Sequence, residues 1–282
     1  MKKRILVLLG FILAGTNSLA AIIGNDDRTD IVELDQPIIS VISSRVVSFV
    51  RKKHLIKKSD SYEMNATNLI ERLRFCEDER FSDEPLFANC SGAIVGEDRI
   101  LTAGHCIGPD NQDEFYVVLD YIKDAQGNIP TTFSKDQVFE VRDFLYREFT
   151  LSDQVNDIAL LRVKRKLNRT PLPVQLDHSY STGTPIYMLG HPLGVSQKYT
   201  GPNIIRSLSL PTLSFRTELD SFSVNSGSPV FDHHTNEIIG VLSRGTGANF
   251  NRRGRSCNQW ALGESGKDYS EVNIVTPLKP LF

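Results

Sequence analysis

From about residue 88 onward, short apolar and β-branched runs alternate with turn-forming residues. Many short strands at such spacing predict an all-β protein built as a barrel or a sandwich. The runs are 93–95, 100–101, 115–119, 138–141, 158–163, 185–189, 204–210, 213–216, 228–231 and 238–243.

The pattern before residue 88 is more mixed. Residues 38–50 are apolar and β-branched, which favours a strand. Residues 65–74 place apolar side chains on one helical face, and Asn68 or Asn65 would cap the helix. The two prolines and weak periodicity of residues 167–176 predict a connection between two β units.

The first twenty residues have the pattern of a secretory signal peptide. A basic start at 1–4 precedes an apolar run at 5–15, and small residues follow at 18–20. The apolar run is too short to cross a bilayer as a helix, so we expect cleavage near Ala20. A retained membrane anchor is the alternative, and no later stretch is long and apolar enough to span a membrane.

Composition and charge exclude some partners. The chain has 282 residues, 40% hydrophobic and 23% charged, with a formal net charge of −2. No strong field therefore favours nucleic acid or anionic membranes. The cysteine spacing does not resemble a zinc site, because no Cys-x-x-Cys pair is present. We expect no metal and no cofactor. Export permits disulfides, and the four cysteines allow three pairings; they are Cys76, Cys90, Cys106 and Cys257.

Two segments carry candidate acid–base chemistry. Residues 102–106 read Thr-Ala-Gly-His-Cys, and an imidazole after a strand and a small-residue turn can act as a general base near neutral pH. Residues 157–161 read Asp-Ile-Ala-Leu-Leu. A carboxylate just before a buried strand can accept a hydrogen bond from the second imidazole nitrogen and fix the tautomer. His105 and Asp157 are the candidates, although such an Asp alone is more often a turn residue.

The third segment, residues 225–230, reads Asn-Ser-Gly-Ser-Pro-Val. A small-residue turn leading into a strand can expose a hydroxyl and aim backbone N–H groups at one point, as acyl transfer requires. A serine is a poor nucleophile unless a base takes its proton, so Ser226 needs a partner such as His105.

Together these strings resemble the chymotrypsin–trypsin family of serine peptidases, in its bacterial secreted branch. The family's histidine lies in Thr-Ala-Ala-His-Cys, its aspartate in Asp-Ile-Ala-Leu-Leu, and its serine in Gly-Asn-Ser-Gly-Ser-Pro in many bacterial members. The resemblance covers roughly residues 85–250 and implies the triad His105, Asp157 and Ser226, with Ser228 at a structural position. The Gly190-His191-Pro192 segment resembles a glycine-rich loop of bacterial members, and we expect a structural role for His191.

The resemblance implies two six-stranded antiparallel β-barrels with the active site in the cleft between them. We expect an N-terminal extension with a short helix at 21–85, the first barrel at 86–170 and the second at 171–282. The extension is either a removable propeptide or a bridged segment. The family spacing implies a Cys90–Cys106 disulfide, which leaves Cys76 and Cys257 for a second bridge.

Val224 departs from the family pattern. That position is usually glycine, and its N–H joins the N–H of the nucleophile, here Ser226, in the oxyanion hole. A β-branched residue resists the backbone conformation that glycine adopts there. Either the peptide is flipped in the free enzyme, or the turn is built differently. Losing one oxyanion donor lowers the rate by about 10²–10³.

The substrate contacts are also read from the resemblance. Asp220 falls where the trypsin branch has its pocket-floor aspartate, which would select Arg or Lys; a turn-capping aspartate is the alternative. Ser243 and Gly245 match the strand that pairs with extended substrates. Leu242 stands where glutamate-specific relatives have histidine, and Phe222 replaces a disulfide cysteine of the trypsin branch.

The sequence thus predicts a secreted or periplasmic serine endopeptidase, a monomer acting on protein or peptide substrates through an acyl-enzyme on Ser226 and favouring Arg or Lys at the cleaved position. The alternative is a catalytically weak or silent homologue that acts as a binding protein.

Overall fold

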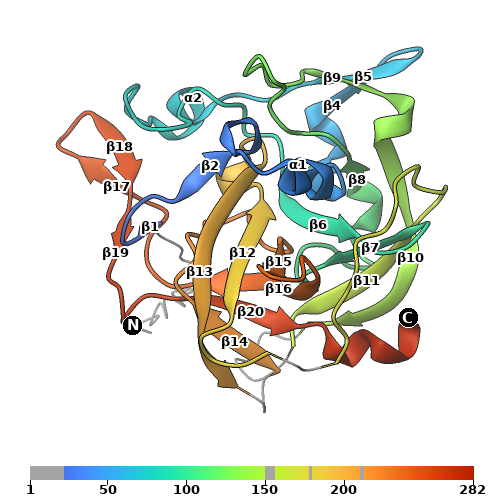
Figure 1. Ribbon diagram of the computed structural model, residues 1–282. Helices are drawn as coiled ribbons and strands as arrows, with labels where there is room; N and C mark the ends of the chain where they lie inside the picture. Colours follow the sequence, from blue (N-terminus) through green and yellow to red (C-terminus); the bar gives the residue numbers. More distant parts are fainter. Residues whose placement is uncertain (1–21, 150–155, 178–179, 210–212) are drawn as a thin grey trace, which may run out of the picture.

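Two antiparallel β-barrels lie side by side in the computed structural model (Figure 1). The structure describes residues 22–149, 156–177, 180–209 and 213–282. The predicted signal peptide, residues 1–20, lies outside the described residues. Within the described ranges, no helix is both long enough and apolar enough to cross a membrane. The predicted fold class, two six-stranded barrels, is confirmed.

The first barrel closes in the strand order β10-β11-β7-β6-β3-β8. Its strands are β3 (Val46–Arg51), β6 (Cys90–Ile94), β7 (Arg99–Thr102), β8 (Phe115–Val118), β10 (Val138–Glu148) and β11 (Ile158–Val163).

The second barrel runs β12-β15-β16-β20-β14-β13 and closes through the β12–β13 pair. Its strands are β12 (Pro185–Gly190), β13 (Lys198–Ser209), β14 (Ser214–Thr217), β15 (Pro229–Asp232), β16 (Ile238–Gly245) and β20 (Ser270–Ile274).

Smaller elements surround the barrels. They are β1 (Ile22–Ile23), β2 (Arg28–Asp30), β4 (Leu55–Lys57), β5 (Ser61–Met64), β9 (Thr132–Ser134), β17 (Phe250–Arg253), β18 (Cys257–Trp260) and β19 (Leu262–Gly263). The helices are α1 (Pro37–Ser43) and α2 (Leu69–Leu73), with 3₁₀ turns η1 (Ile31–Glu33), η2 (Lys52–His54), η3 (Gln112–Glu114), η4 (Lys135–Gln137), η5 (Pro192–Gly194) and η6 (Thr276–Leu281).

The first barrel begins earlier than the sequence predicted. Strand β3, within the predicted extension 21–85, pairs with both β6 and β8, so the barrel starts at Val46 and not at residue 86. Residues 38–50 form α1 followed by β3 instead of one strand. Pro37 occupies the first turn of α1, where its fixed φ suits a helix and its missing N–H costs nothing. The predicted helix within 65–74 is α2, and the Asn68 side chain caps it by accepting the Glu71 N–H.

The chain ends cross over between the barrels. Strand β2 pairs with β13 and β1 pairs with β19, so the N-terminal segment packs on the second barrel before the chain enters the first. At the other end, η6 lies beside the first barrel (Figure 1), where Arg99 donates to the Leu281 carbonyl at 2.6 Å. Each barrel is therefore held by a segment that belongs in sequence to the other.

Three apolar cores account for the rigidity of this arrangement. One fills each barrel, and a third joins Leu101 and Leu160 of the first barrel to Tyr187 and Phe231 of the second. Because burial of apolar area is the main stabilising term, the shared core fixes one barrel against the other. The cleft between them inherits that fixed geometry.

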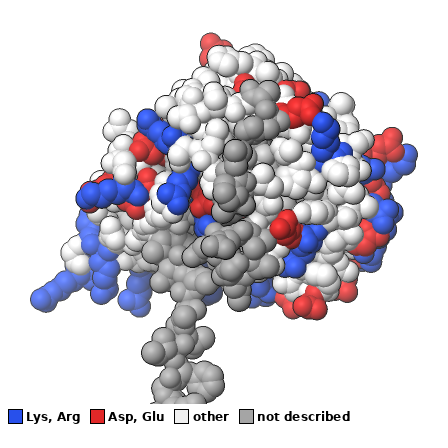
Figure 2. All heavy atoms as spheres, turned by 90° about the horizontal axis from the view of Figure 1, so that it is seen from below, with Lys and Arg blue, Asp and Glu red and all other residues white. Residues whose placement is uncertain are grey.

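Charges on the surface are mixed in sign. Figure 2 shows one face on which basic and acidic side chains lie next to each other at several places near the edge. On this face, charge of neither sign dominates, in keeping with the formal net charge of −2.

A buried ion cluster fastens the N-terminal segment to the second barrel. Lys198 is fully buried, and its Nζ lies 2.5 Å from Asp30 and 2.8 Å from Glu84. Lys123 contacts the same two carboxylates at 2.6 and 2.7 Å. Burial lowers the pKa of Lys198, against the opposing effect of both carboxylates. Two positive and two negative charges thus compensate each other inside the protein, which is the condition for burying them.

We expect Glu84→Gln to lower the free energy of unfolding by about 3 kcal/mol, because Lys198 loses one of its two buried counter-charges. Urea unfolding followed by tryptophan fluorescence would measure the change. Glu97→Gln, which removes the partner of exposed Lys166, serves as the control and should have no measurable effect. Equal stability of Glu84→Gln and the parent protein would contradict the assignment.

Candidate active site

His105 and Asp157 meet at the rim of the first barrel. His105 follows β7, and Asp157 directly precedes β11, which pairs with β7. The Asp157 carboxylate accepts two hydrogen bonds from His105, one from the backbone N–H at 2.8 Å and one from Nδ1 at 2.5 Å. This places the imidazole proton on Nδ1 and leaves Nε2 free to act as a base.

Gly104 permits this approach of the histidine turn to the neighbouring strand. A Cβ at Gly104 would lie 2.2 Å from the Glu148 carbonyl oxygen of β10, a distance no side chain can occupy. The glycine in the Thr-Ala-Gly-His-Cys string is therefore required by packing against β10.

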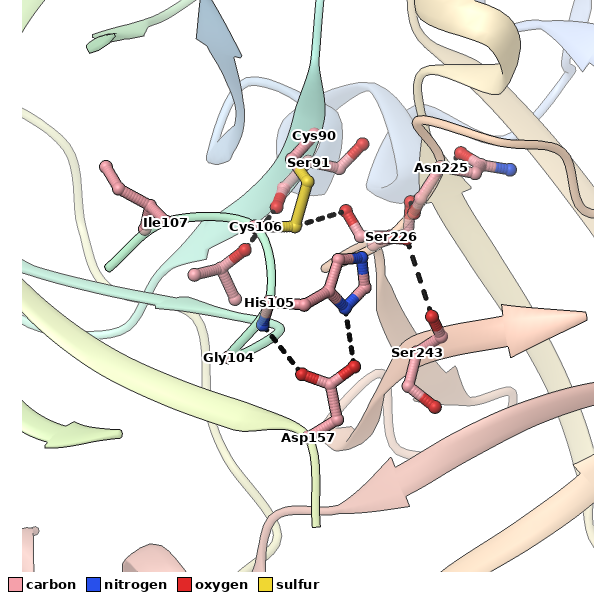
Figure 3. Close-up of a disulfide and its surroundings, with 12 residues drawn as sticks. Cys90, Ser91, Gly104, His105, Cys106, Ile107, Asp157, Asn225, Ser226 and Ser243 are labelled. Atoms are coloured by element: carbon pink, nitrogen blue, oxygen red, sulfur yellow. Dashed lines mark hydrogen bonds and ion pairs between the residues drawn. A yellow bond between two sulfur atoms is a disulfide. The ribbon is translucent and has the colours of Figure 1, made fainter. Parts of the chain in front are cut away.

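Ser226 is held from the first barrel as well as from its own. The Ser91 N–H of β6 donates to the Ser226 carbonyl at 2.8 Å, and the Ser226 hydroxyl donates to the Ser243 carbonyl of β16 at 3.4 Å. Figure 3 shows the His105 ring between Asp157 and Ser226. The structure records no hydrogen bond between His105 and Ser226, a common state of free sites that tightens on substrate binding.

The turn before Ser226 has a defined type. The Asn225 N–H donates to the Phe222 carbonyl at 3.0 Å, and Val224 has φ of +75° while Ser223 has no positive φ. A positive φ at the third residue alone is the mark of a type II turn. Valine pays about 1–2 kcal/mol for a left-handed conformation. The type II turn therefore forms although the β-branched Val224 occupies its left-handed position.

The peptide between Ser223 and Val224 has a fixed direction. The Leu193 N–H of η5 donates to the Ser223 carbonyl at 2.9 Å. In a trans peptide the C=O and N–H point in opposite directions, so the Val224 N–H points away from Leu193. Within the described residues, neither the Val224 nor the Ser226 N–H has a hydrogen-bond partner. Both residues line a pocket of about 260 Å³ that also contains His105.

The contacts of two other candidate residues, Ser228 and His191, indicate structural roles. Ser228 is fully buried and donates to the Asn225 carbonyl at 2.5 Å, which leaves its hydroxyl committed within the turn. His191 is buried, stacks on Tyr121 and shares a 3.0 Å hydrogen bond with the Ser91 hydroxyl. Burial, aided by the charge of Lys198, lowers the pKa of His191 to about 3, so the ring is uncharged.

Asp220 faces the N-terminal segment. Its carboxyl group is buried and accepts the Ile23 N–H at 2.7 Å and the Asp27 N–H at 3.1 Å. Burial and the adjacent Asp27 carboxyl raise the pKa of Asp220 to about 8. These contacts count against the predicted role in selecting Arg or Lys, because a group held by two backbone donors and favouring its neutral form is a poor partner for a substrate cation.

The N-terminal segment also supports the residue next to the turn. Arg28 is buried with its guanidinium 4.4 Å from the Phe222 ring centroid and 4.0 Å from that of Trp260, and it pairs with Asp26 at 2.8 Å. Such stacking is worth up to about 2 kcal/mol when desolvated. Residues 22–30 thus brace the chain from Asp220 to Phe222 that leads into Ser226. No sequence pattern pointed to Arg28, because the Phe222 and Trp260 rings that it contacts lie far away along the chain.

Both predicted disulfides are present. Cys90–Cys106 joins the start of β6 to the residue after His105, and Cys76–Cys257 ties the segment after α2 to β18. Cys90, His105 and Cys106 are spaced as metal ligands could be, but both sulfurs are used in the disulfide. The predicted substrate-pairing residues Ser243 and Gly245 lie on β16, and Ser243 is the one that contacts Ser226.

Comparisons with known proteins agree with this geometry. Residues 90–241, more than half of the chain, match the family described as trypsin-like peptidase domain. Glutamyl endopeptidase of Bacillus licheniformis is 24% identical over 183 residues, which cover 56% of this chain and 55% of that protein. The chain therefore matches only about half the length of this curated relative.

Solved structures give weaker likenesses. The active form of the Rv3671c protease from M. tuberculosis aligns with a TM-score of 0.48 at 18% identity, covering 89% of this chain and 85% of that one. The VesB protease of Vibrio cholerae aligns with a TM-score of 0.48 at 12% identity, covering 84% and 62%.

The chain belongs to the trypsin-like peptidase domain family.

The left-handed backbone at Val224 predicts an inverted ranking of two substitutions. Glycine normally destabilises relative to alanine, but at φ of +75° it avoids the Cβ clash. We expect Val224→Gly to be more stable than Val224→Ala by about 1 kcal/mol. Urea unfolding of both variants measures the difference, and a more stable alanine variant would mean that the turn is not of type II.

The raised pKa of Asp220 predicts a pH-dependent stability. The folded protein holds a proton near pH 8 that the unfolded chain releases near pH 4. The contribution of Asp220 is therefore full below about pH 4 and is lost as the pH rises to about 8, by up to about 1.4 kcal/mol per pH unit. We expect the stability of the parent protein relative to Asp220→Asn to fall between pH 5 and pH 8. A difference that does not vary with pH in urea unfolding would argue against the buried carboxyl pair.

Proposed function

We propose that this protein is a secreted endopeptidase that cleaves peptide bonds through an acyl-enzyme on Ser226. The observation that carries the proposal is the 2.5 Å contact between Asp157 and His105 Nδ1 beside a serine whose turn leaves two N–H groups unpaired. This is the arrangement of base, orienting carboxylate, nucleophile and oxyanion donors that acyl transfer requires.

The steps follow from the roles of these groups. His105 Nε2 takes the Ser226 proton as Oγ attacks the substrate carbonyl carbon. The resulting negative oxygen accepts hydrogen bonds from the N–H groups of Val224 and Ser226. The imidazolium, stabilised by Asp157, then gives its proton to the leaving amine as the C–N bond breaks. Water, deprotonated by His105, hydrolyses the resulting ester and restores the serine.

The alternative, a weak or silent homologue acting as a binding protein, was motivated by Val224. The type II turn and the Leu193 contact support an active enzyme, because they direct the Val224 N–H as a working oxyanion hole needs. Because Val224 is strained, we expect the enzyme to react more slowly than an otherwise identical one with glycine at position 224.

Substrate preference and location rest on separate observations. Selection of Arg or Lys by Asp220 stays a prediction, against which its contacts with Ile23 and Asp27 count. We expect cleavage profiling of a proteome-derived peptide library to give the same Arg and Lys frequencies for the parent and Asp220→Asn. The two disulfides and the basic-apolar start of the chain support export.

A serine-directed fluorophosphonate should label the mature protein at Ser226, located by peptide mass spectrometry. Ser226→Ala should lose the label and about 10⁵–10⁶ of kcat. Asp157→Asn should keep the fold but lower kcat by about 10⁴, because the imidazole takes the wrong tautomer. Labelling at Ser228, or unlabelled protein that is correctly folded by circular dichroism, would refute the assignment of Ser226.

A further inference from the structure

A second pocket adjoins the catalytic one. It encloses about 470 Å³ and shares Asn89 and Val224 with the pocket that holds His105 and Ser226. Its walls come from η2, α2 and the segment after β5 on one side, and from η5 and the nucleophile turn on the other. Residues of both barrels thus build it, as they build the catalytic cleft.

The wall of this pocket is basic and has no acidic counterpart. Lys53, His54 and Arg72 line it, and among its described lining residues there is no Asp or Glu. Neither Lys53 nor Arg72 forms an ion pair within the described part of the chain. By contrast, Arg51 in the catalytic pocket is neutralised by Glu114 at 2.8 Å. Positive charge is therefore concentrated and left uncompensated in the second pocket.

The pKa of His54 responds to the positive charges around this pocket. Its pKa is lowered, first by burial and then by the charges of Lys53, Arg51 and Arg72. The part of this shift that comes from the three cations, as distinct from burial, would attract an anion to the same place.

The position of the pocket tells which part of a substrate it would meet. In the substrate pairing that the family resemblance implies, the half that forms the acyl-enzyme lies along β16, on the Ser243 side of Ser226. Figure 3 shows the Cys90–Cys106 disulfide on the opposite side of Ser226 from Ser243. The leaving half therefore passes the disulfide and Asn89 toward the basic pocket. At about 3.3 Å per extended residue, the pocket beyond the catalytic one receives the second or third residue after the cleaved bond.

We propose that this basic pocket is a carboxylate-binding subsite for the leaving half of the substrate, at the second or third residue after the cleaved bond. The carboxylate comes from an acidic side chain or from a free chain end. Lys53 and Arg72 supply the attraction, and Val224 separates the subsite from the reacting carbonyl. The proposal deepens the proposed peptidase function and rests on it for the direction of the chain.

The test uses quenched fluorescent peptides with one common sequence before the cleaved bond. Three peptides differ after it: Glu at the second and third positions, Gln at both with an amidated end, and Gln at both with a free carboxylate after the third residue. We expect kcat/KM for the Glu peptide to exceed that of the amidated Gln peptide by about threefold to tenfold at low salt, and the ratio to shrink at 0.5 M NaCl. A gain for the free-end peptide alone would assign the carboxylate to the chain end.

The double substitution Lys53→Gln with Arg72→Gln should bring the ratio of kcat/KM for the Glu peptide to that for the amidated Gln peptide close to one. The control, Lys267→Gln with Lys279→Gln, removes the same charge from exposed pairs with Glu264 and Asp177 and should keep the preference. A ratio of one in the parent protein, or an equal loss in the control, would overturn the subsite.

A binding measurement separates this proposal from the peptidase function. The Ser226→Ala protein should bind the Glu form of a peptide matching the leaving half more tightly than the Gln form, by a similar factor in calorimetry. Failure of all peptides to turn over, with that binding difference intact, would refute the peptidase function and support the subsite. Equal binding would refute the subsite whatever the activity.

Discussion

The direction of one peptide bond governs the chemistry of this site. The Leu193 N–H holds the Ser223 carbonyl at 2.9 Å, and this contact turns the Val224 N–H to the opposite side. In the proposed mechanism, a reversed peptide would put a carbonyl oxygen where the substrate's negative oxygen forms, and the proposed triad would act without one of its two oxyanion donors. The bond to Leu193 offsets part of the 1–2 kcal/mol or so that a left-handed valine costs.

That turn is in place because segments from across the chain brace it. Asp220 and Phe222, just before it, are held by Ile23 and by the buried Arg28. The residue after it, Ser226, is pinned to the first barrel by Ser91. The shared apolar core and the Lys198 ion cluster keep these supports in register. The N-terminal segment therefore supports this turn. Its removal as a propeptide would leave buried Lys198 without Asp30 and Glu84, and the Phe222 ring without Arg28.

The sequence predicted the parts of this arrangement that depend on short strings. His105, Asp157 and Ser226 stand in motifs whose local backbone is set by glycines and adjoining strands, and the structure brings them together. Short apolar and β-branched runs between turn-forming residues likewise located most strands of both barrels. The start of the first barrel was missed because an apolar, β-branched run such as 38–50 suits a strand or a buried helix face equally well, and only Pro37 favours the helix.

Contacts between distant segments could not be predicted from the sequence. Asp220 was read from its place in a family motif, whereas its surroundings are set by the backbone of Ile23 and Asp27, nearly two hundred residues earlier. Lys53 and Arg72 of the basic pocket come from separate elements, and their spacing along the chain does not predict that they lie close together. Val224 could be flagged as unusual, but the Leu193 contact that compensates it needed the fold.

A crystal structure of the mature protein with a peptidyl boronate bonded to Ser226 would show the direction of the peptide bond between Ser223 and Val224 directly. We expect a boronate oxygen that accepts hydrogen bonds from the N–H groups of both Val224 and Ser226, with the Ser223 carbonyl still bonded to the Leu193 N–H. A Ser223 carbonyl that points at the boronate, with the Leu193 bond broken, would contradict it.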